Sequence, residues 1–293
     1  MGSIIDQIGN TPLIHTTTIL NKPNVRLLLK LEGNNPGGSV KDRPVLNMIS
    51  EALKRGDIKK GDTLVEATSG NTGIALAYVS RLFGLHMKLI MPESSTKERV
   101  DTMRAYGAEV ILTSSDIGIE GSRDLALQLQ KDKGYTLLNQ FENDDNWKAH
   151  FKTTGPEIWE DTKGQITHFV SAMGTTGTIT GTATFLKAQN KNITIVGAQP
   201  KEGSRIPGIR KWSPAYVPGI FNRSLVDQII EVSAEEAKAT TQRLAKEEGV
   251  FAGMSSGGAV SVALKVANQI DHGTIVAIIC DRGDRYLSSD LFG

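Results

Sequence analysis

Lys41 is the residue of this chain best placed for covalent chemistry. It lies in a polar, glycine-rich segment that leads into a predicted helix, Asn34-Asn35-Pro36-Gly37-Gly38-Ser39-Val40-Lys41-Asp42-Arg43. The positive end of a helix dipole disfavours a nearby ammonium group, so a lysine there favours its free amine, which condenses with aldehydes. The segment is compatible with an amine catalyst and equally with a solvated lysine at an ordinary helix start.

The predicted helix after Lys41 carries a start signal. Ser39 and Asp42 are spaced as a capping pair, in which Ser39 accepts a backbone N–H and Asp42 bonds back to the backbone three residues earlier. Pro44 has no N–H to donate, which moves the expected helix start toward Arg43.

Three further loops combine glycines with hydroxyl side chains, and each joins a predicted strand to a predicted helix. They are residues 65–73 (VEATSGNTG, before a helix from Ile74), 171–181 (SAMGTTGTITG) and 253–259 (GMSSGGA, before a helix over 260–267). Exposed backbone N–H groups at helix N-termini bind carboxylates and phosphates, although each loop alone is more often a structural turn. The glycine spacing in 171–181 is not the G-x-G-x-x-G dinucleotide fingerprint, and no Walker motif is present, so a nucleotide-dependent Rossmann protein is disfavoured.

These loops must be positioned by alternating strands and helices. Short β-branched runs predict strands over 25–31, 63–67, 87–91, 109–113, 136–139, 168–173, 193–198 and 274–279. Segments between them place apolar residues three and four apart, as at Ile74, Ala77 and Tyr78. This alternation predicts an α/β fold with parallel sheets, whose carboxyl ends gather ligand-binding loops on one rim. The acidic stretch 142–146 is the best candidate for a domain boundary.

Composition excludes several function classes. Lys plus Arg number 33 against 32 Asp plus Glu, so charge alone favours neither nucleic acid nor an anionic membrane as partner. Cys280 is the single cysteine and the five histidines show no HExxH spacing, which predicts no disulfide framework and no metal site. The N-terminus lacks a signal-peptide pattern and no apolar run is long enough to span a bilayer, so we expect a cytoplasmic protein.

Four of the motifs, taken together, resemble one known family. Residues 34–43, 68–73, 174–181 and 255–259 are similar to the pyridoxal-phosphate enzymes of the tryptophan synthase β-subunit fold, specifically the cysteine synthases (O-acetylserine sulfhydrylases). The likeness runs nearly from end to end and includes IGNTPL at 8–13. Within that family, GTTGT at 174–178, IPGIRKW at 206–212 and CDRGDRYLS at 280–288 are similar to the B-type enzymes.

The resemblance implies a fold type II architecture of two three-layer α/β domains with mostly parallel sheets. Residues 35–145 would form a smaller, mobile, substrate-binding domain, and 1–34 with 146–293 a larger, cofactor-binding one. The resemblance also implies a homodimer. Because the chain stops at Gly293, no regulatory domain of the cystathionine β-synthase type is expected.

The resemblance assigns the cofactor, pyridoxal 5'-phosphate, to particular residues. Lys41 would hold it as a Schiff base and later serve as the general base. Its phosphate would lie in a cradle formed by Gly174, Thr175, Thr176, Gly177 and Thr178. Asn71 would bond the ring 3'-oxygen, and Ser255 would face the pyridine nitrogen, where a neutral hydroxyl leaves the ring a weaker electron sink than a carboxylate does.

The resemblance also assigns a substrate side. The α-carboxylate of the substrate would be bound by Thr68, Ser69, Gly70, Thr72 and Gln140. Arg210 and Cys280 would line the sulfur-donor side, and an arginine suits a sulfonate or phosphate group. Each has an alternative: Arg210 as a surface charge, Cys280 as a small buried hydrophobe, and residues 281–285 as a salt-linked surface turn.

The implied reaction is β-replacement. The enzyme would make L-cysteine from O-acetyl-L-serine and sulfide, and S-sulfocysteine from thiosulfate. The alternatives are a serine or threonine dehydratase with the same cofactor, a cysteine synthase that uses O-phosphoserine, and a catalytically idle paralogue that binds partners.

Overall fold

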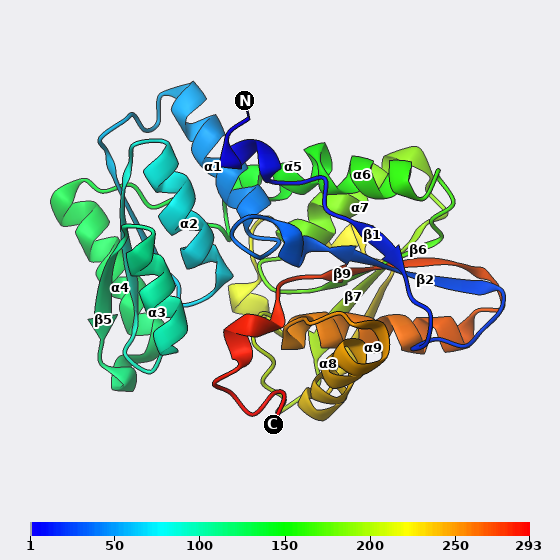
Figure 1. Ribbon diagram of the computed structural model, residues 1–293. Coiled ribbons are helices and arrows are strands. Elements are labelled where there is room, and N and C mark those ends of the chain that lie inside the picture. Colours follow the sequence, from blue (N-terminus) through cyan, green and yellow to red (C-terminus); the bar gives the residue numbers. More distant parts are fainter. Residues whose placement is uncertain (1) are drawn as a thin grey trace.

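Two sheets organise the computed structural model, which describes residues 2–293 (Figure 1). The larger sheet has six strands in the order β1-β2-β9-β6-β7-β8 and the smaller has three in the order β3-β4-β5. The larger sheet contains β1 (Leu13–His15), β2 (Val25–Leu31), β9 (Gly273–Ile279), β6 (His168–Ala172), β7 (Thr194–Pro200) and β8 (Gln228–Val232). The smaller sheet contains β3 (Thr63–Ala67), β4 (His86–Pro92) and β5 (Glu109–Thr113).

Both sheets are parallel apart from one edge pair. β1 pairs with β2 in the antiparallel sense, and every other strand pair is parallel. Strands covered on both faces read as continuous apolar runs, and β9 shows this clearly, since Thr274 to Ile279 are all buried. The predicted α/β alternation with mostly parallel sheets is confirmed.

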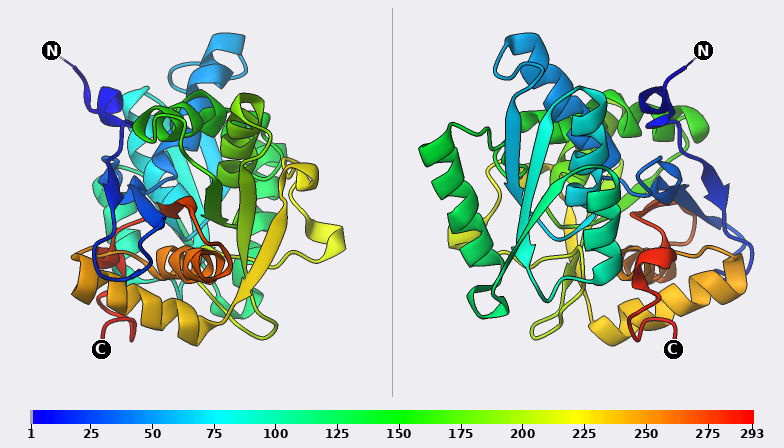
Figure 2. Two further views of the ribbon diagram at one scale, coloured as in Figure 1. Left: turned by 90° about the vertical axis from the view of Figure 1, so that its right-hand side faces the viewer. Right: turned by 60° about the vertical axis from the view of Figure 1, so that its left-hand side comes forward.

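Helices cover both faces of each sheet. They are α1 (Asp42–Arg55), α2 (Asn71–Leu82), α3 (Lys97–Ala105), α4 (Gly118–Lys133), α5 (Asp144–Lys152), α6 (Thr154–Asp161), α7 (Gly177–Gln189), α8 (Ala234–Glu248) and α9 (Met254–Gln269). On the larger sheet, α8 and α9 pack on one face and α6 and α7 on the other. On the smaller sheet, α4 covers the face opposite to α1, α2 and α3 (Figure 2).

Short 3-10 helices complete the chain. They are Ile4–Gln7, Glu32–Asn34, Ser115–Ile117, Pro214–Tyr216, Arg223–Leu225 and η6 (Gly283–Tyr286). Within residues 2–293, no helix has both the length and the apolar character that crossing a bilayer requires.

The strands expected from the sequence need three corrections, one for a wrong strand and two for missed strands. The strand predicted over 136–139 is wrong, because only Thr136 pairs, in an isolated bridge with Leu64, before the chain turns at Asn139 with a φ of 51°. Two strands were not predicted. β1 is too short, at three residues, to show a repeating pattern, and β8 follows two short 3-10 helices that obscure its start.

Glu66 in β3 makes the stability of the smaller sheet depend on pH. Burial is the main cause that raises the pKa of this carboxyl to about 7, and the backbone N–H of Asn139, 3.3 Å away, opposes it. The folded protein therefore binds this proton more tightly than the unfolded chain. Its stabilising contribution is complete below about pH 4 and is lost as the pH rises through about 7.

The variant Glu66→Gln should flatten this dependence. Between pH 5 and pH 8 we expect the wild type to lose about 2 kcal/mol more of its free energy of unfolding than the variant loses. Urea unfolding at the two pH values measures the difference. Glu109→Gln on β5, where the side chain is 60% exposed, is the matched control and should behave as the wild type; equal pH slopes for all three proteins would refute the assignment.

Candidate active site

Lys41 lies directly before α1, on a loop attached to the end of β9. The Val40 N–H donates to the Cys280 carbonyl at 2.8 Å, and Ser39 pairs with Asp281 in an antiparallel bridge. These contacts fix the lysine at the carboxyl end of the larger sheet.

The predicted capping pair forms only in part. Ser39 Oγ accepts the Lys41 backbone N–H at 3.2 Å, as expected, but Asp42 Oδ2 accepts the Gly37 N–H at 2.5 Å instead of bonding back to Ser39. α1 begins at Asp42, one residue before the expected start. Pro44 is accommodated because the first four N–H groups of a helix have no partner within it.

The Lys41 amine is held in a state that favours its neutral form. Desolvation lowers its pKa, and electrostatic interactions with Cys280, Asp281 and Glu32 oppose that shift. Lys41 makes no ion pair with any carboxylate of residues 2–293. Burial, rather than the helix dipole invoked from the sequence, is therefore the main cause that favours the free amine.

A buried ion network holds the first turn of α1. The Arg43 guanidinium contacts Glu32 at 2.7 Å and Glu157 at 2.6 Å, and Lys30 reaches Glu157 at 2.9 Å. These charges come from α1, β2 with its following turn, and α6, so they tie the lysine-bearing helix to the larger sheet. Removal of one charged side chain would leave its partners buried without an opposite charge, which is costly. The network therefore holds the first turn of α1 in a fixed position.

The loop at 174–178 joins β6 to α7 and is tightly packed. Thr176 adopts a left-handed φ of 70°, which turns the chain into the helix that begins at Gly177. A Cβ at Gly177 would lie 2.1 Å from Asn146 Oδ1, and a Cβ at Gly181 2.0 Å from the Trp147 carbonyl. Glycine at these positions allows α5 to pack against the first turns of α7.

His150 supports the same loop from α5. Its Nε2 is 3.3 Å from Thr178 Oγ1, and its Nδ1 is 2.8 Å from Thr154 Oγ1. Burial is the main cause that lowers the pKa of His150 well below its usual value, with Arg43 and Lys41 adding to the effect. The imidazole is therefore neutral and serves to orient the Thr178 hydroxyl.

Asn71 is the first residue of α2 and is held from the C-terminal segment. Its Nδ2 donates to Asp281 Oδ2 at 2.7 Å, and Arg285 donates to its Oδ1. Tyr286 also donates to Asp281 Oδ2, at 2.7 Å, and Arg285 bonds the Gly37 carbonyl. α2 therefore begins three residues earlier than Ile74, the start expected from the sequence.

These contacts correct the alternative that residues 281–285 form a salt-linked surface turn. Arg282 and Asp284 do pair on the surface, at 3.1 Å, but Asp281 is only 1% exposed and Arg285 is directed at Asn71. Asp281, Arg285 and Tyr286 are functional candidates that the sequence reasoning missed. The B-type resemblance of residues 280–288 was the only signal that pointed to them.

One cavity, partly open to solvent, unites most of the predicted cofactor residues. About 430 Å³ of space lies between its atoms. Its lining is Val40, Lys41, Asn71, Ser171, Ala172, Gly174, Thr175, Thr176, Thr178, Gly208, Ser255 and Cys280. Of the predicted cofactor set only Gly177 is absent from the lining, because it lies behind the loop against α5.

Ser255 and Cys280 both line this cavity. Ser255 is buried in the first turn of α9, which begins at Met254 and not at Val260 as expected. Cys280 borders the core and also lines the cavity, and its predicted place on the sulfur-donor side stays a prediction. Burial, as the largest cause, raises the pKa of its thiol to about 11, and the thiol is therefore protonated at neutral pH.

The predicted carboxylate loop adjoins the cavity without lining it. Thr68, Thr72 and Gln140 are buried, whereas Ser69 and Gly70 are half-buried. Thr72 Oγ1 donates to Gln140 Oε1 at 2.8 Å. The Asn146 amide then connects the Gln140 carbonyl, at 2.6 Å, to Thr175 Oγ1, at 3.4 Å, so hydrogen bonds link this loop to the cradle.

Arg210 is not brought into the cavity. Its side chain is exposed and lies over the Trp212 ring, 5.5 Å from the ring centre, while its backbone N–H donates to the Met173 carbonyl. Trp212 Nε1 in turn donates to the Gly174 carbonyl at 2.8 Å. The segment therefore supports the cradle, and the predicted contact of Arg210 with the sulfur donor stays a prediction.

The donor set suits a molecule that carries a phosphate at one end and an aldehyde at the other. Threonine hydroxyls and the N-terminus of α7 supply donors for a phosphate, while the Lys41 amine, the Asn71 amide and the Ser255 hydroxyl line the rest of the cavity. Among the residues described, no three His, Cys, Asp or Glu side chains are grouped to hold a metal ion.

The sequence is similar to those of known proteins along almost its whole length. The family model described as pyridoxal-phosphate dependent enzyme matches residues 4–281. Cysteine synthase B of Escherichia coli is 57% identical over 293 residues, which cover 100% of this chain and 97% of that protein. Cysteine synthase B of Pseudomonas aeruginosa is 55% identical over 290 residues, with 99% and 97% covered.

Solved structures agree with the fold. The cysteine synthase of Entamoeba histolytica superposes with a TM-score of 0.95 at 38% identity and covers 100% of this chain and 90% of its own. An O-ureido-L-serine synthase gives a TM-score of 0.94 at 36% identity, with 100% and 95% covered. The fold type II architecture expected from the sequence is confirmed.

Proposed function

Because the chain belongs to the family of pyridoxal-phosphate dependent enzymes, we propose that it is a cysteine synthase of the B type. It makes L-cysteine from O-acetyl-L-serine and sulfide by β-replacement, and it also accepts thiosulfate to give S-sulfocysteine. The observation that carries this proposal is the meeting of the Lys41 amine, Asn71, the threonine cradle and Ser255 in one cavity of a chain 57% identical to a cysteine synthase B.

The proposed roles follow from what each residue can do. When bound, pyridoxal phosphate supplies an electron sink that stabilises negative charge on the substrate α-carbon. Lys41, whose amine has its pKa lowered by burial, attaches the cofactor and then takes the α-proton at Nζ. Thr175, Thr176 and Thr178 bind the phosphate, and neutral His150 keeps Thr178 oriented.

The remaining residues tune the cofactor ring and bind the substrates. Ser255 offers a neutral hydroxyl to the ring nitrogen, which favours rapid expulsion of the leaving group over prolonged delocalisation of charge. The loop Thr68 to Thr72, with Gln140, binds the α-carboxylate through N–H groups and hydroxyls at the start of α2. Arg210 meets an oxyanionic sulfur donor.

We further propose that residues 35–145 close over the substrate as a unit and that two chains form a homodimer. Closure excludes water from the reacting carbon, which separates replacement by sulfur from hydrolytic side reactions. A cytoplasmic location is proposed because the single cysteine suits a reducing compartment.

A comparison of products tests the function. Protein loaded with pyridoxal phosphate should form cysteine from O-acetylserine and sulfide, with pyruvate release at least about tenfold slower. Parallel assays with thiosulfate and with O-phosphoserine establish the sulfur donor and the leaving group. Pyruvate release that outpaces cysteine formation in the presence of sulfide would identify a dehydratase instead.

A further inference from the structure

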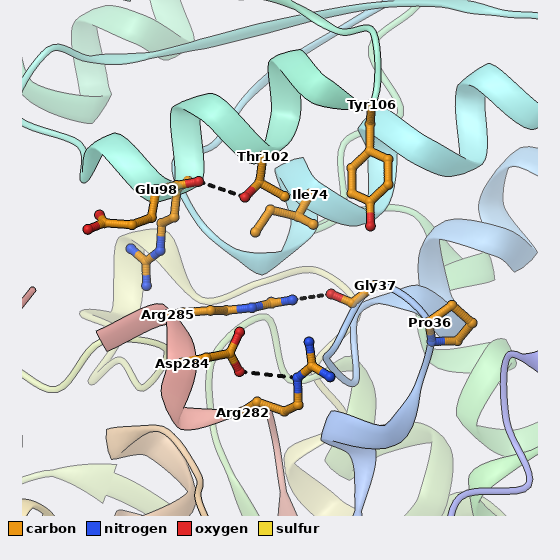
Figure 3. A pocket seen from close by; sticks show the side chains of 10 residues that line it. Pro36, Gly37, Ile74, Glu98, Thr102, Tyr106, Arg282, Asp284 and Arg285 are labelled. Atoms are coloured by element: carbon orange, nitrogen blue, oxygen red, sulfur yellow. Dashed lines mark hydrogen bonds and ion pairs between the residues drawn. The ribbon is translucent and has the colours of Figure 1, made fainter. Parts of the chain in front are cut away.

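A second cavity lies beside the candidate active site, at the junction between α3 and the C-terminal segment (Figure 3). About 560 Å³ of space lies between its atoms, and it is partly open to solvent. Its lining is Pro36, Gly37, Ile74, Glu98, Arg99, Thr102, Tyr106, Arg282, Asp284 and Arg285. Three of these ten residues are arginines, and none of the proposed reaction steps uses the cavity.

Two of the arginines form no ion pair with a described carboxylate. Neither Arg99 nor Arg285 forms an ion pair with a carboxylate of residues 2–293, since every salt bridge to an arginine involves Arg43, Arg55, Arg243 or Arg282. Arg285 donates only to neutral oxygens, those of the Asn71 side chain and the Gly37 backbone.

Arg99 also retains an unsatisfied donor. Its guanidinium carbon lies 5.4 Å from the centre of the Tyr286 ring, and its Nε is buried with no hydrogen-bond partner in the described part of the chain. A buried, unpaired N–H of a charged group is costly, so the site favours an acceptor with negative charge.

The acidic side chains of the lining do not neutralise this pair. Asp284 is already engaged with Arg282, at 3.1 Å, and the Glu98 carboxylate forms no ion pair with an arginine of residues 2–293. Tyr106, which directly follows α3, adds a hydroxyl group to the lining, whereas the Thr102 hydroxyl donates to the Glu98 carbonyl at 2.6 Å. The cavity thus offers guanidinium and hydroxyl donors around unneutralised positive charge.

We propose that this cavity binds a small inorganic oxyanion, of the sulfate or phosphate class, between Arg99 and Arg285. The planar fork of a guanidinium matches the paired oxygens of such an anion, and charge-assisted hydrogen bonds of this kind are the strong ones. The bound anion joins α3, on the smaller sheet, to the C-terminal segment that follows β9. This proposal does not depend on the reaction assigned to the active site.

The site is coupled to the active site through one side chain. Arg285 holds both Asn71 and the carbonyl of Gly37, four residues before Lys41. An anion that engages the guanidinium of Arg285 therefore restrains the residue that orients Asn71. The site thereby links α3 to the segment whose Arg285 contacts Asn71, a residue that lines the reaction cavity.

Titration calorimetry on the cofactor-loaded protein tests the proposal. Sodium sulfate and sodium phosphate are titrated separately, each against sodium chloride at matched ionic strength. We expect saturable binding of at least one oxyanion to the wild type and a Kd at least about tenfold higher in Arg99→Gln, because a charged pair of hydrogen bonds is lost.

Two variants on the same helix separate a specific site from general effects. Arg104→Gln removes the same charge from an exposed position of α3 outside the cavity and should bind the anion as the wild type does. Glu98→Gln removes a negative charge from the lining and should bind it several-fold more tightly, a gain that damage to the fold does not produce.

Any one of three results would overturn the proposal. They are the absence of saturable binding beyond the chloride control in the wild type, equal affinities of Arg99→Gln and the wild type, or equal losses in Arg99→Gln and Arg104→Gln. If Arg99→Gln does not fold, the Glu98→Gln comparison decides: tighter binding supports the site, and unchanged or weaker binding refutes it.

Discussion

Replacement of Lys41 by alanine is expected to reduce cysteine formation by at least about 10³-fold. The variant loses the group that attaches the cofactor and the group that takes the α-proton, and these are the same amine. Burial lowers the pKa of that amine, and no ion pair with a described carboxylate restrains it. Initial rates with O-acetylserine and sulfide measure the loss of activity.

Covalent trapping of the cofactor tests its attachment to Lys41 separately from catalytic activity. Borohydride reduction of the loaded wild type, followed by mass measurement of its peptides, should place the cofactor mass on the peptide that contains Lys41, and the alanine variant should lack it. Lys54→Ala, at the exposed end of the same helix, is the control and should retain both mass and activity. Cofactor mass on a different lysine of the wild type would disprove the assignment.

The second large effect is expected at the cradle. The double variant Thr175→Ala with Thr178→Ala removes two hydroxyls that line the cavity at the start of α7. Hydrogen bonds to charged groups contribute about 1.5–3 kcal/mol each, so the Kd for pyridoxal phosphate should rise about 10²- to 10⁴-fold. Equilibrium dialysis against a series of cofactor concentrations measures the change.

The control for the cradle lies nearly two turns further along α7. Thr184→Ala removes a hydroxyl that donates to the Thr180 carbonyl at 2.7 Å and does not line the cavity, so its affinity for the cofactor should equal that of the wild type. At saturating cofactor the double variant should regain most of its turnover, because its defect is in anchoring. An unchanged Kd in the double variant would place the phosphate elsewhere.

Both predictions concern residues whose roles depend on supports from distant parts of the chain. Lys41 is fixed by β9 and by the ion network of Arg43, Glu32 and Glu157, and Thr178 is oriented by His150. These supports come from five different elements. A site built in this way is rigid on the side of the larger sheet, which is where an anchored phosphate must be held.

The sequence by itself determined the elements and the kind of chemistry. Alternation of β-branched runs with apolar residues three and four apart is a local property, so it predicted most strands within one or two residues. Glycines and hydroxyls at strand-to-helix junctions are equally local, and they identified the loops around Lys41, Asn71, Thr175 and Ser255 that the structure brings into one cavity.

Only the tertiary structure decided what surrounds those loops. The contacts of Asp281 and Arg285 with Asn71 join residues more than 200 positions apart in the chain, and no local pattern encodes such a pair. The same holds for the two unpaired arginines of the second cavity and for the burial that lowers the pKa of Lys41. Hydrogen-bond partners and desolvation depend on which segments meet in space, and periodicity along a sequence carries no information on that meeting.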